Sequence, residues 1–246
     1  MILTAKTLVK QIARKLGYKI TKISNPITPN LEGNDMNSGL QRFITTSSSV
    51  NTIIDVGAAA GTWTERAIPL FPKSNFLLVE PLVERKTELE TLAKKHQNIN
   101  LLFKALGKEK SMLPFSISSD LDGSGFYDTG DLREIPVIDL DTAIEDLKLP
   151  GPFLLKLDTH GFEVPILKGA KSVLLQTQLV IIEVYGFKIS DKSLFFWEMI
   201  TYMEQLGFRL FDIVDTMRRP KDKAFWQCDA FFIRKDHQIF SSDEYN

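Results

Sequence analysis

The 246-residue sequence is poor in cysteine, in net charge and in long apolar runs. Its only cysteine, Cys228, excludes an internal disulfide framework and an all-cysteine metal site, and it suits a reducing compartment. With 30 Lys and Arg against 31 Asp and Glu, the net charge of -1 gives no global attraction to nucleic acid. No apolar run approaches the roughly 20 residues that cross a bilayer, and the first residues lack the pattern of a signal peptide. We therefore expect a cytoplasmic protein with no nucleic-acid partner.

The N-terminal stretch up to Lys22 contains six basic residues and no acidic residue. Four apolar residues recur in it at helical spacing: Ala5, Val9, Ile12 and Leu16. A basic amphipathic helix of this kind packs on its own domain or on a partner subunit, as in a homodimer, or makes peripheral contact with an anionic membrane. Residues 24–39 are rich in Pro, Asn and Gly and predict a linker or loop. We expect the helix and linker over residues 1–40 and the main domain over residues 41–246.

From residue 51 onward, short β-rich apolar runs alternate with helical patterns, which is typical of βαβ units and a largely parallel sheet. Seven strands are predicted, at residues 52–56, 75–79, 100–104, 153–157, 179–184, 209–214 and 227–234. Helices are predicted at residues 62–70, 82–95, 141–147, 164–175 and 194–206. No helical pattern separates the last two strands, so they should form an antiparallel hairpin around a loop from Arg218 to Lys221. The predicted fold class is α/β, with a Rossmann-like, seven-stranded, mostly parallel sheet and an antiparallel C-terminal hairpin.

An insertion near residues 108–140 separates the third and fourth predicted strands. It contains two short stretches with strand character, Met112–Ser118 and Glu134–Ile138, around a loop of Gly, Ser and Asp. Ser124 and the three residues after it, up to Tyr127, are predicted to form a lid or one wall of a ligand site.

The first predicted strand runs directly into a loop of small residues, Asp55-Val56-Gly57-Ala58-Ala59-Ala60-Gly61. Small residues at a strand-to-helix turn let a ligand touch the backbone, with the amides of the helix pointing at it. A dinucleotide fingerprint requires a glycine where Ala59 stands, so this loop lacks the glycine that approaches a pyrophosphate. Asp55 is predicted either to order the loop or to reach an amino group of the ligand.

A carboxylate ends the second predicted strand, in Leu77-Leu78-Val79-Glu80-Pro81. Glu80 lies 25 positions after Asp55, close to the spacing of about 20 that is expected in nucleotide-binding βαβ units. At a strand tip it can accept hydrogen bonds from both hydroxyls of a ribose, whereas the structural alternative is a residue that faces solvent. We interpret Glu80 as the ligand of an adenosine group.

The densest group of ionisable residues follows the strand predicted at residues 153–157. Lys156, Asp158, His160 and Glu163 lie across the carboxyl end of this strand, where open α/β sheets bind ligands. His160 suits a general base for a hydroxyl, because the ordinary histidine pKa of about 6.5 is close to neutral pH. Asp158 and His160 are alternatively ligands of a divalent cation that lowers the pKa of a substrate oxygen. The structural alternative is that Asp158 and Glu163 cap the next helix and Lys156 pairs with one of them.

Glu183 is a charge within the apolar strand Ile181-Ile182-Glu183-Val184-Tyr185. A lone buried carboxylate is costly, so a partner or a role in a site is expected. Glu183 and Tyr185 are predicted to face the same crevice as Asp158, with a structural ion pair as the alternative for Glu183. On the last strand, Trp226 is interpreted as a packing residue and Asp229 as a surface residue.

Several segments match one known family in order and spacing across roughly residues 51–235. They are Ile54-Asp55-Val56-Gly57-Ala58 with Gly61 and Thr64, Val79-Glu80-Pro81, Ala105-Leu106-Gly107, Leu155-Lys156-Leu157-Asp158 with Gly161-Phe162-Glu163, Leu167-Lys168-Gly169-Ala170, and Glu183-Val184. The chain thereby resembles the FkbM-type methyltransferases. It departs from them at two positions, since many members have Asn in place of Ala59 and Glu in place of His160.

The resemblance implies a class I fold, S-adenosylmethionine as methyl donor, and usually O-methylation of a hydroxyl on a sugar or natural product. The residues that would hold the donor are Asp55, Gly57, Ala58, Ala59, Gly61, Thr64, Glu80, Pro81, Ala105 and Leu106. The catalytic residues would be Asp158, His160, Lys156 and Glu163, and the residues that contact a small-molecule or glycan acceptor would be Ser124, Glu183 and Tyr185. The basic N-terminal helix also looks like those of relatives associated with surface polysaccharide synthesis.

Two other hypotheses stand beside methyl transfer. A nicotinamide-dependent oxidoreductase shares the fold, but the missing glycine at Ala59 and the terminal hairpin argue against it. A binding module that keeps the scaffold without turnover is the second, because fold alone never proves catalysis and the chain departs from the family pattern at Ala59 and His160.

Overall fold

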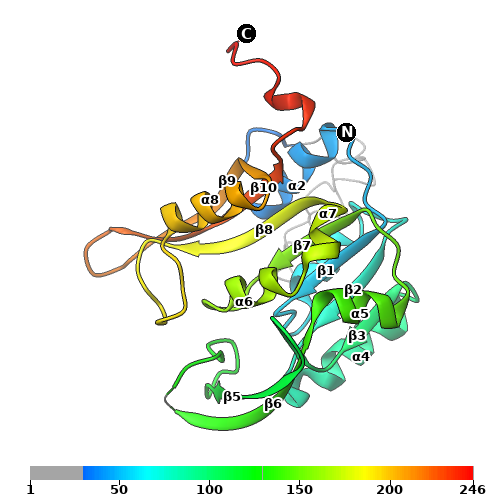
Figure 1. The fold of residues 1–246 in the computed structure, drawn as a ribbon, viewed down its shortest axis with the longest axis vertical. Coiled ribbons are helices and arrows are strands. Elements are labelled where there is room, and N and C mark those ends of the chain that lie inside the picture. Colours follow the sequence, from blue (N-terminus) through cyan, green and yellow to red (C-terminus); the bar gives the residue numbers. More distant parts are fainter. Residues whose placement is uncertain (1–29, 129, 246) are drawn as a thin grey trace, which may run out of the picture. The chain divides into compact units, whose positions relative to one another are not determined.

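Seven strands form a sheet in the order β3-β2-β1-β7-β8-β10-β9 in the computed structural model, which describes residues 30–128 and 130–245 (Figure 1). Their bounds are β1 (Thr52–Val56), β2 (Asn75–Val79), β3 (Ile99–Leu102), β7 (Phe153–Leu157), β8 (Thr177–Tyr185), β9 (Phe208–Arg218) and β10 (Phe225–Arg234). The strands from β3 to β8 are parallel, and β10 runs antiparallel to both β8 and β9. The predicted fold class and the C-terminal hairpin are confirmed. The predicted basic helix at the N-terminus lies outside the described residues.

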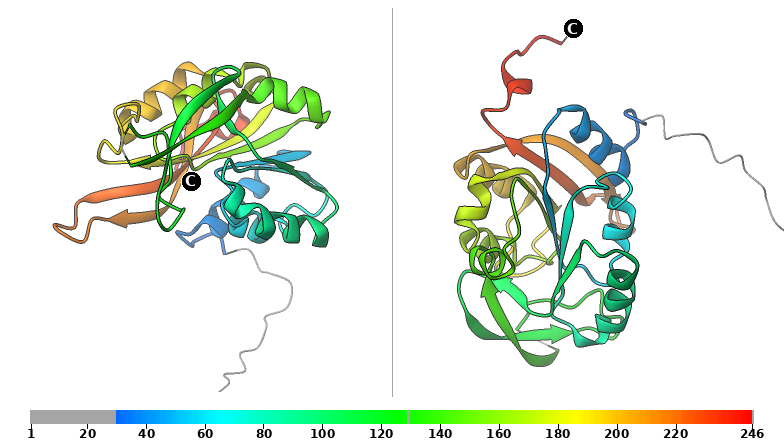
Figure 2. Two further views of the ribbon diagram at one scale, coloured as in Figure 1. Left: turned by 90° about the horizontal axis from the view of Figure 1, so that it is seen from below. Right: turned by 90° about the vertical axis from the view of Figure 1, so that its right-hand side faces the viewer.

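Helices cover both faces of this sheet, as the two views in Figure 2 show. On one face lie α2 (Met36–Thr45), α3 (Thr62–Ala67) and, after a 3-10 turn at Val83–Arg85, α4 (Lys86–Lys95). On the other lie α5 (Leu140–Leu147), α6 (Glu163–Lys168), α7 (Lys171–Leu175) and α8 (Phe196–Gln205). Neighbouring strand residues pack into opposite cores, Ile53 with the first set of helices and Ile54 with the second. Burial on both faces explains why the strands read as continuous apolar runs. No helix of the described chain is long and apolar enough to span a bilayer.

Helix α2 was not predicted, because it begins inside the segment interpreted as a linker. The Asp35 side chain caps it by accepting from the Ser38 amide at 3.0 Å. Gly39 packs so tightly that an added Cβ would lie 2.9 Å from the Phe231 ring of β10. The predicted loop therefore ends at Asp35, and a tertiary contact rather than helix propensity fixes the helix after it.

The helix predicted at residues 164–175 is broken into α6 and α7 at Gly169. A Cβ at Gly169 would lie 2.1 Å from the backbone carbonyl oxygen of Gly107, so the chain approaches another backbone here and turns. The 3-10 helix Gln238–Phe240 follows β10 and was not predicted either.

The insertion forms a second sheet with the strand order β4-β6-β5, built from β4 (Ala105–Gly107), β5 (Ser111–Ile117) and β6 (Asp131–Asp139). The two strands predicted in the insertion are confirmed as β5 and β6, whereas β4 is too short to show a strand pattern. The Phe126 ring stacks on the Phe162 ring with centroids 3.8 Å apart. This contact fixes the loop between β5 and β6 beside the segment that follows β7.

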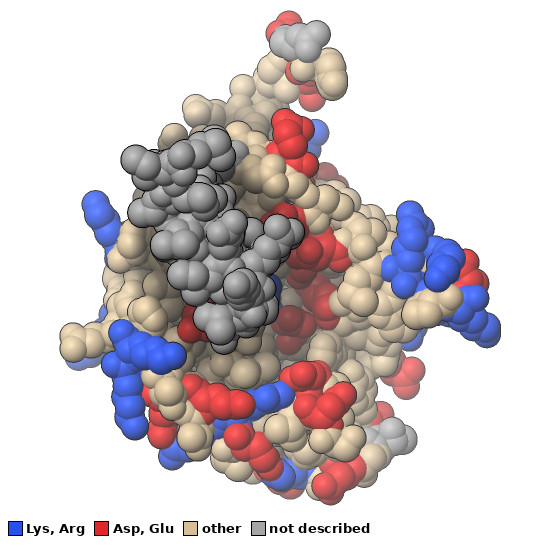
Figure 3. All heavy atoms as spheres, turned by 180° about the vertical axis from the view of Figure 1, so that it is seen from behind, with Lys and Arg blue, Asp and Glu red and all other residues tan. Residues whose placement is uncertain are grey.

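The β9–β10 hairpin carries a basic tip. Arg218, Lys221 and Lys223 are exposed there, and Figure 3 shows Lys and Arg side chains gathered at this projecting end. Arg219 lies over the Phe187 ring, 4.0 Å from its centroid, so the tip is anchored to the segment after β8.

Candidate active site

A pocket opens at the carboxyl ends of β1, β2 and β7, between the insertion and the small-residue segment Asp55–Gly61, which we call the glycine loop. Six of the residues predicted to hold a donor line it: Gly57, Ala59, Glu80, Pro81, Ala105 and Leu106. Four residues predicted for catalysis or the acceptor also line it: Asp158, His160, Ser124 and Glu183. The other predicted residues do not line it: Asp55, Ala58, Gly61, Thr64, Lys156, Glu163 and Tyr185. The structure thus brings the two predicted groups of residues to one cavity.

Gly57 sits where the ends of β1, β2 and β7 meet. Its φ is +79°, and its amide and that of Ala58 both donate to the Val79 carbonyl, at 3.0 and 3.1 Å. A Cβ at Gly57 would lie only 2.0 Å from the backbone carbonyl oxygen of Asp158. Glycine is therefore required here by backbone conformation and by close approach together.

Replacing Gly57 with alanine should lower the free energy of unfolding by about 2–5 kcal/mol, the sum of a left-handed backbone penalty and overpacking. Urea unfolding followed by circular dichroism measures this loss. Gly123→Ala is the control, because its added Cβ would meet nothing closer than 3.4 Å. Equal stability of the two variants would contradict the predicted requirement for glycine.

Glu80 ties the glycine loop to the end of β2. Its Oε2 accepts from the Ala59 amide and its Oε1 from the Leu82 amide, both at 2.9 Å. The residue is 5% exposed, which rules out the solvent-facing alternative, and burial raises the pKa of its carboxyl group. Each carboxylate oxygen has two acceptor positions, so each keeps one for a ligand hydroxyl after its bond to the backbone.

Asp55 is fully buried below the loop rather than exposed in the pocket. Its Oδ2 accepts from the Thr64 hydroxyl at 2.7 Å, while no hydrogen-bond donor of the described residues reaches its Oδ1. The Lys156 Nζ lies 3.7 Å from that Oδ1. Burial raises the pKa of Asp55, and the lysine and the Thr64 hydroxyl oppose this shift. Of the two predicted roles, this placement fits the ordering of the loop.

Lys156 is a buried cation that bridges β1 and β7. Its Nζ donates to Asp158 Oδ2 at 2.9 Å and lies 5.5 Å from the centroid of the Trp63 ring. Burial disfavours the charged ammonium, but the carboxylates of Asp158 and Asp55 outweigh it and hold the Lys156 pKa above its ordinary value. The lysine therefore stays charged, and it supports Asp158 from behind the pocket wall.

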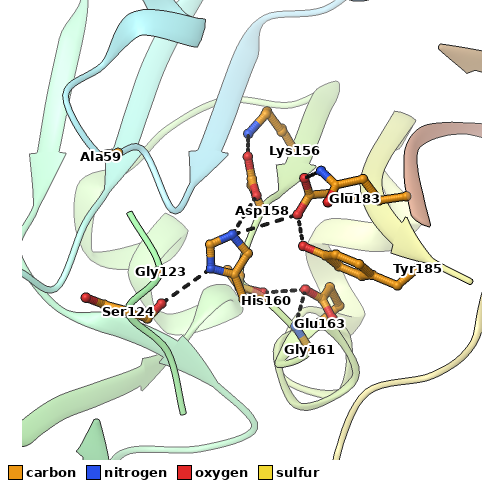
Figure 4. A network of polar contacts seen from close by, with 12 residues as sticks. Ala59, Gly123, Ser124, Lys156, Asp158, His160, Gly161, Glu163, Glu183 and Tyr185 are labelled. Atoms are coloured by element: carbon orange, nitrogen blue, oxygen red, sulfur yellow. Dashed lines mark hydrogen bonds and ion pairs between the residues drawn. The ribbon is translucent and has the colours of Figure 1, made fainter. Parts of the chain in front are cut away.

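Three ionisable side chains converge at the pocket: Asp158 after β7, His160 in the next turn and Glu183 on β8 (Figure 4). The His160 Nε2 lies 3.7 Å from Asp158 Oδ1 and 3.8 Å from Glu183 Oε2. We call these three residues the acid–imidazole cluster. The chain places one nitrogen and two carboxylate oxygens around a single point that is open to a ligand.

The backbone and the insertion fix how His160 enters this cluster. Its φ is +51°, a left-handed conformation that is uncommon outside glycine. Its Nδ1 lies 3.4 Å from the Ser124 carbonyl oxygen. A carbonyl oxygen only accepts, so Nδ1 is the protonated nitrogen in the neutral ring and Nε2 presents its lone pair to the two carboxylates.

Glu183 is held by two donors, one from its own strand and one from the neighbouring strand. The Tyr185 hydroxyl donates to its Oε2 and the Gln227 amide donates to its Oε1. Burial, followed by the nearby charge of Asp158, raises the pKa of Glu183 to about 8. Burial and the same Glu183 carboxyl group hold the Tyr185 pKa above its ordinary value.

Asp229 was interpreted as a surface residue, and this is wrong. It pairs with Glu183 across β8 and β10 and is half-buried. Burial raises its pKa to about 7, with Asp158 and Asp215 adding to the shift and Lys156 opposing it. Like Glu183, Asp229 is a charged residue inside an apolar strand, and this pattern could have identified it from the sequence.

Glu163 supports the turn that carries His160. Its Oε1 accepts from the Gly161 amide and the Thr159 hydroxyl, both at 3.0 Å. The side chain is 3% exposed, and burial raises the pKa of its carboxyl group. Glu163 thus does not line the pocket, and its bonds hold the turn before α6 rather than cap that helix, which has no side-chain cap.

A family model for the methyltransferase FkbM domain matches residues 55–210 of the chain. This match includes the glycine loop from Asp55, Glu80 and the whole acid–imidazole cluster. A search of curated proteins found no significant match.

Solved structures of several methyltransferases are similar to this one. A methyltransferase FkbM from Methylobacillus flagellatus KT is 12% identical, with a TM-score of 0.49 over 93% of this chain and 71% of that one. Fibrillarin from Aeropyrum pernix, with natively bound S-adenosyl-L-methionine, is 14% identical, with a TM-score of 0.45 over 73% and 66%. A 1,6-didemethyltoxoflavin-N1-methyltransferase from Burkholderia thailandensis, with bound S-adenosylhomocysteine, is 10% identical, with a TM-score of 0.46 over 79% and 75%.

Proposed function

Because the chain belongs to the FkbM methyltransferase family, we propose that it transfers a methyl group from S-adenosylmethionine to a hydroxyl oxygen of a sugar, glycan or other natural product. The observation that carries this proposal is one pocket lined by the glycine loop, by Glu80 and by the acid–imidazole cluster. The loop and Glu80 form its donor side. The cluster and the insertion form its acceptor side.

The donor side fits an adenosine compound. Glu80 has one free acceptor position on each oxygen for the two ribose hydroxyls, and Val79 and Leu106 offer apolar surface to an adenine ring. Gly57 and Ala59 line the pocket beside Glu80, where we place the amino acid end of the donor. When bound, the donor supplies a methyl group on a positively charged sulfur and leaves as neutral S-adenosylhomocysteine.

The acceptor side fits a hydroxyl that must lose its proton as its oxygen takes the methyl group. Asp158, His160 and Glu183 are the pocket groups that can hold this oxygen or receive its proton. Phe126, stacked on Phe162, lines the pocket on the insertion side. Alignment of donor and acceptor then supplies most of the rate enhancement.

Glu80→Gln should weaken the binding of S-adenosylhomocysteine by about 10- to 100-fold, because a hydrogen bond to a charged group contributes about 1.5–3 kcal/mol. Isothermal titration calorimetry measures this change. Glu84→Gln is the matched control, since Glu84 is exposed and pairs with Arg133 outside the pocket. Equal affinities for the two variants would contradict the assignment of Glu80 to the ribose.

A radiolabelled methyl-transfer screen over glycans and small hydroxyl compounds tests the reaction itself. We expect labelled product that is stable to alkaline treatment, as an ether is and an ester is not. Failure of the intact protein to bind S-adenosylhomocysteine would refute the proposed donor. Donor binding without transfer to any hydroxyl compound would favour the non-catalytic module, and binding of a nicotinamide cofactor instead would favour the oxidoreductase.

The partners predicted from the sequence become part of this proposal. A glycan or small-molecule acceptor follows from the open acceptor side, and no nucleic-acid partner is proposed. We also propose that the basic N-terminal stretch contacts an anionic membrane or a second copy of the chain, which would bring the enzyme to surface polysaccharide synthesis. Vesicle co-sedimentation and light scattering of the full chain test these two contacts.

A further inference from the structure

The acid–imidazole cluster and the buried residues next to it contain more carboxyl groups than cations. Four carboxyl groups, those of Asp55, Asp158, Glu183 and Asp229, interact electrostatically with the ammonium group of Lys156. Like charges that share a poorly solvated site repel one another, and each needs a counter-charge or a proton. The ion pairs of Lys156 are with Asp158 and Asp55, so the side of the pocket at Glu183 has no ammonium or guanidinium partner of its own among the described residues.

The three atoms of the acid–imidazole cluster have the spacing of a metal site. Asp158, His160 and Glu183 each offer one ligand atom, and these atoms all lie within 4.8 Å of one another. A point equidistant from three atoms 3.7 Å apart lies about 2.1 Å from each, which is a usual bond length for a small divalent cation. The two distances from His160 Nε2 are 3.7 and 3.8 Å, which is close to this arrangement.

A proton shared between His160 and one of the carboxylates explains these distances less well. If His160 were a doubly protonated ring bound to the carboxylates, Nε2 should lie at about 2.7–3.2 Å from one of them. Both observed distances are longer, at 3.7 and 3.8 Å. Neither carboxyl group is therefore in hydrogen-bond contact with His160 Nε2.

Each ligand also has a second partner of the kind that orients metal ligands. Lys156 donates to the other oxygen of Asp158, and Gln227 donates to the other oxygen of Glu183. The Ser124 carbonyl accepts from His160 Nδ1, which leaves the Nε2 lone pair directed into the cluster. The side chains remain reachable from the pocket, with 33%, 26% and 13% exposure for Asp158, His160 and Glu183.

We propose that Asp158, His160 and Glu183 bind one divalent cation, which holds the acceptor hydroxyl and lowers its pKa. Two carboxylates and one imidazole suit Mn²⁺ and related first-row cations, and three protein ligands leave coordination positions for water and the acceptor. In this role Glu183 binds the cation in addition to lining the acceptor side of the pocket. The inference rests on the proposed function for its catalytic meaning, but the binding of the cation is independent of it.

Titration of the full-length, EDTA-treated protein with Mn²⁺ tests this site. Electron paramagnetic resonance of free Mn²⁺ and calorimetry should show one site per chain. Glu183→Gln should weaken the binding by about 100-fold or more, because removal of even a supporting partner costs about 10- to 100-fold. Glu145→Gln is the matched control, since Glu145 is exposed on α5, and it should bind Mn²⁺ as the unmodified protein does.

The two proposals fail in different ways. Circular dichroism must show that Glu183→Gln is folded, and His160→Ala provides a second variant with the same expected loss of Mn²⁺ binding. No Mn²⁺ binding by the unmodified protein, or undiminished binding by both variants, would overturn the cation site. If S-adenosylhomocysteine still binds and methyl transfer continues in EDTA, the proposed function survives without the cation. Mn²⁺ binding without any binding of S-adenosylhomocysteine would leave the cation site and remove the proposed donor.

Discussion

Replacing Asp158 with asparagine should lower kcat for methyl transfer by about 10²- to 10⁴-fold, the usual contribution of a group that assists deprotonation. Asp158 is the only cluster residue that faces both the buried cation and the pocket, since its Oδ2 accepts from Lys156 and its Oδ1 faces His160. Asparagine keeps the size of the side chain but removes its charge. Steady-state kinetics with a saturating donor and the acceptor found by the screen measure the change.

Asp146→Asn is the control for Asp158→Asn, because Asp146 is exposed on α5 and does not line the pocket. We expect unchanged kinetics for this control. Binding of S-adenosylhomocysteine to Asp158→Asn should stay within about tenfold of the unmodified protein, since Glu80 holds the ribose at the end of another strand. A variant that keeps full kcat would refute the catalytic role of Asp158, and a loss confined to donor binding would move Asp158 to the donor side.

Lys156→Met should lower the free energy of unfolding by about 3–5 kcal/mol, the usual cost of breaking a buried ion pair by removal of one partner. Methionine fills much of the lysine volume but leaves Asp55 fully buried with no cation. Asp158 also loses its hydrogen bond from Nζ. Chemical denaturation monitored by tryptophan fluorescence and by circular dichroism measures the loss.

A double variant separates charge from packing in this prediction. In Asp55→Asn/Lys156→Met, the uncompensated buried carboxylate is gone, so stability should recover part of the loss seen in Lys156→Met. If the double variant is less stable than Lys156→Met by the full cost of Asp55→Asn alone, the two side chains are not coupled. That additive result would contradict the role of Lys156 as the counter-ion of Asp55.

The sheet could be predicted from sequence because its strands are buried on both faces. The predicted bounds of Thr52–Val56, Asn75–Val79 and Phe153–Leu157 are confirmed, since a fully buried parallel strand appears as a short apolar run between turn residues. Helix α2 and the break at Gly169 could not be predicted in this way. Both depend on contacts with residues far away in sequence, the Phe231 ring and the Gly107 carbonyl.

The residues of the site also fall into those that the sequence predicts and those that depend on contacts distant in sequence. Glu80, Asp158 and His160 follow strand ends, so topology alone predicts that they meet at one edge of the sheet. The roles of Lys156 and Glu163 are set by the residues behind the pocket, and spacing along the chain does not show which carboxyl groups face inward. Gln227 and Asp229 were missed because β10 inserts beside β8, and its partners are known only when the strand order is known.

The position of β10 also governs when the enzyme can form during synthesis. Strand β10, the last strand of the described residues, lies between β8 and β9, and it supplies Gln227, which donates to Glu183. A nascent chain that ends before residue 225 therefore has β8 as an open, apolar sheet edge, which is a site for misassociation. It also has a Glu183 without its amide donor. The ribosome must therefore release the β9–β10 hairpin before Glu183 can be held by Gln227.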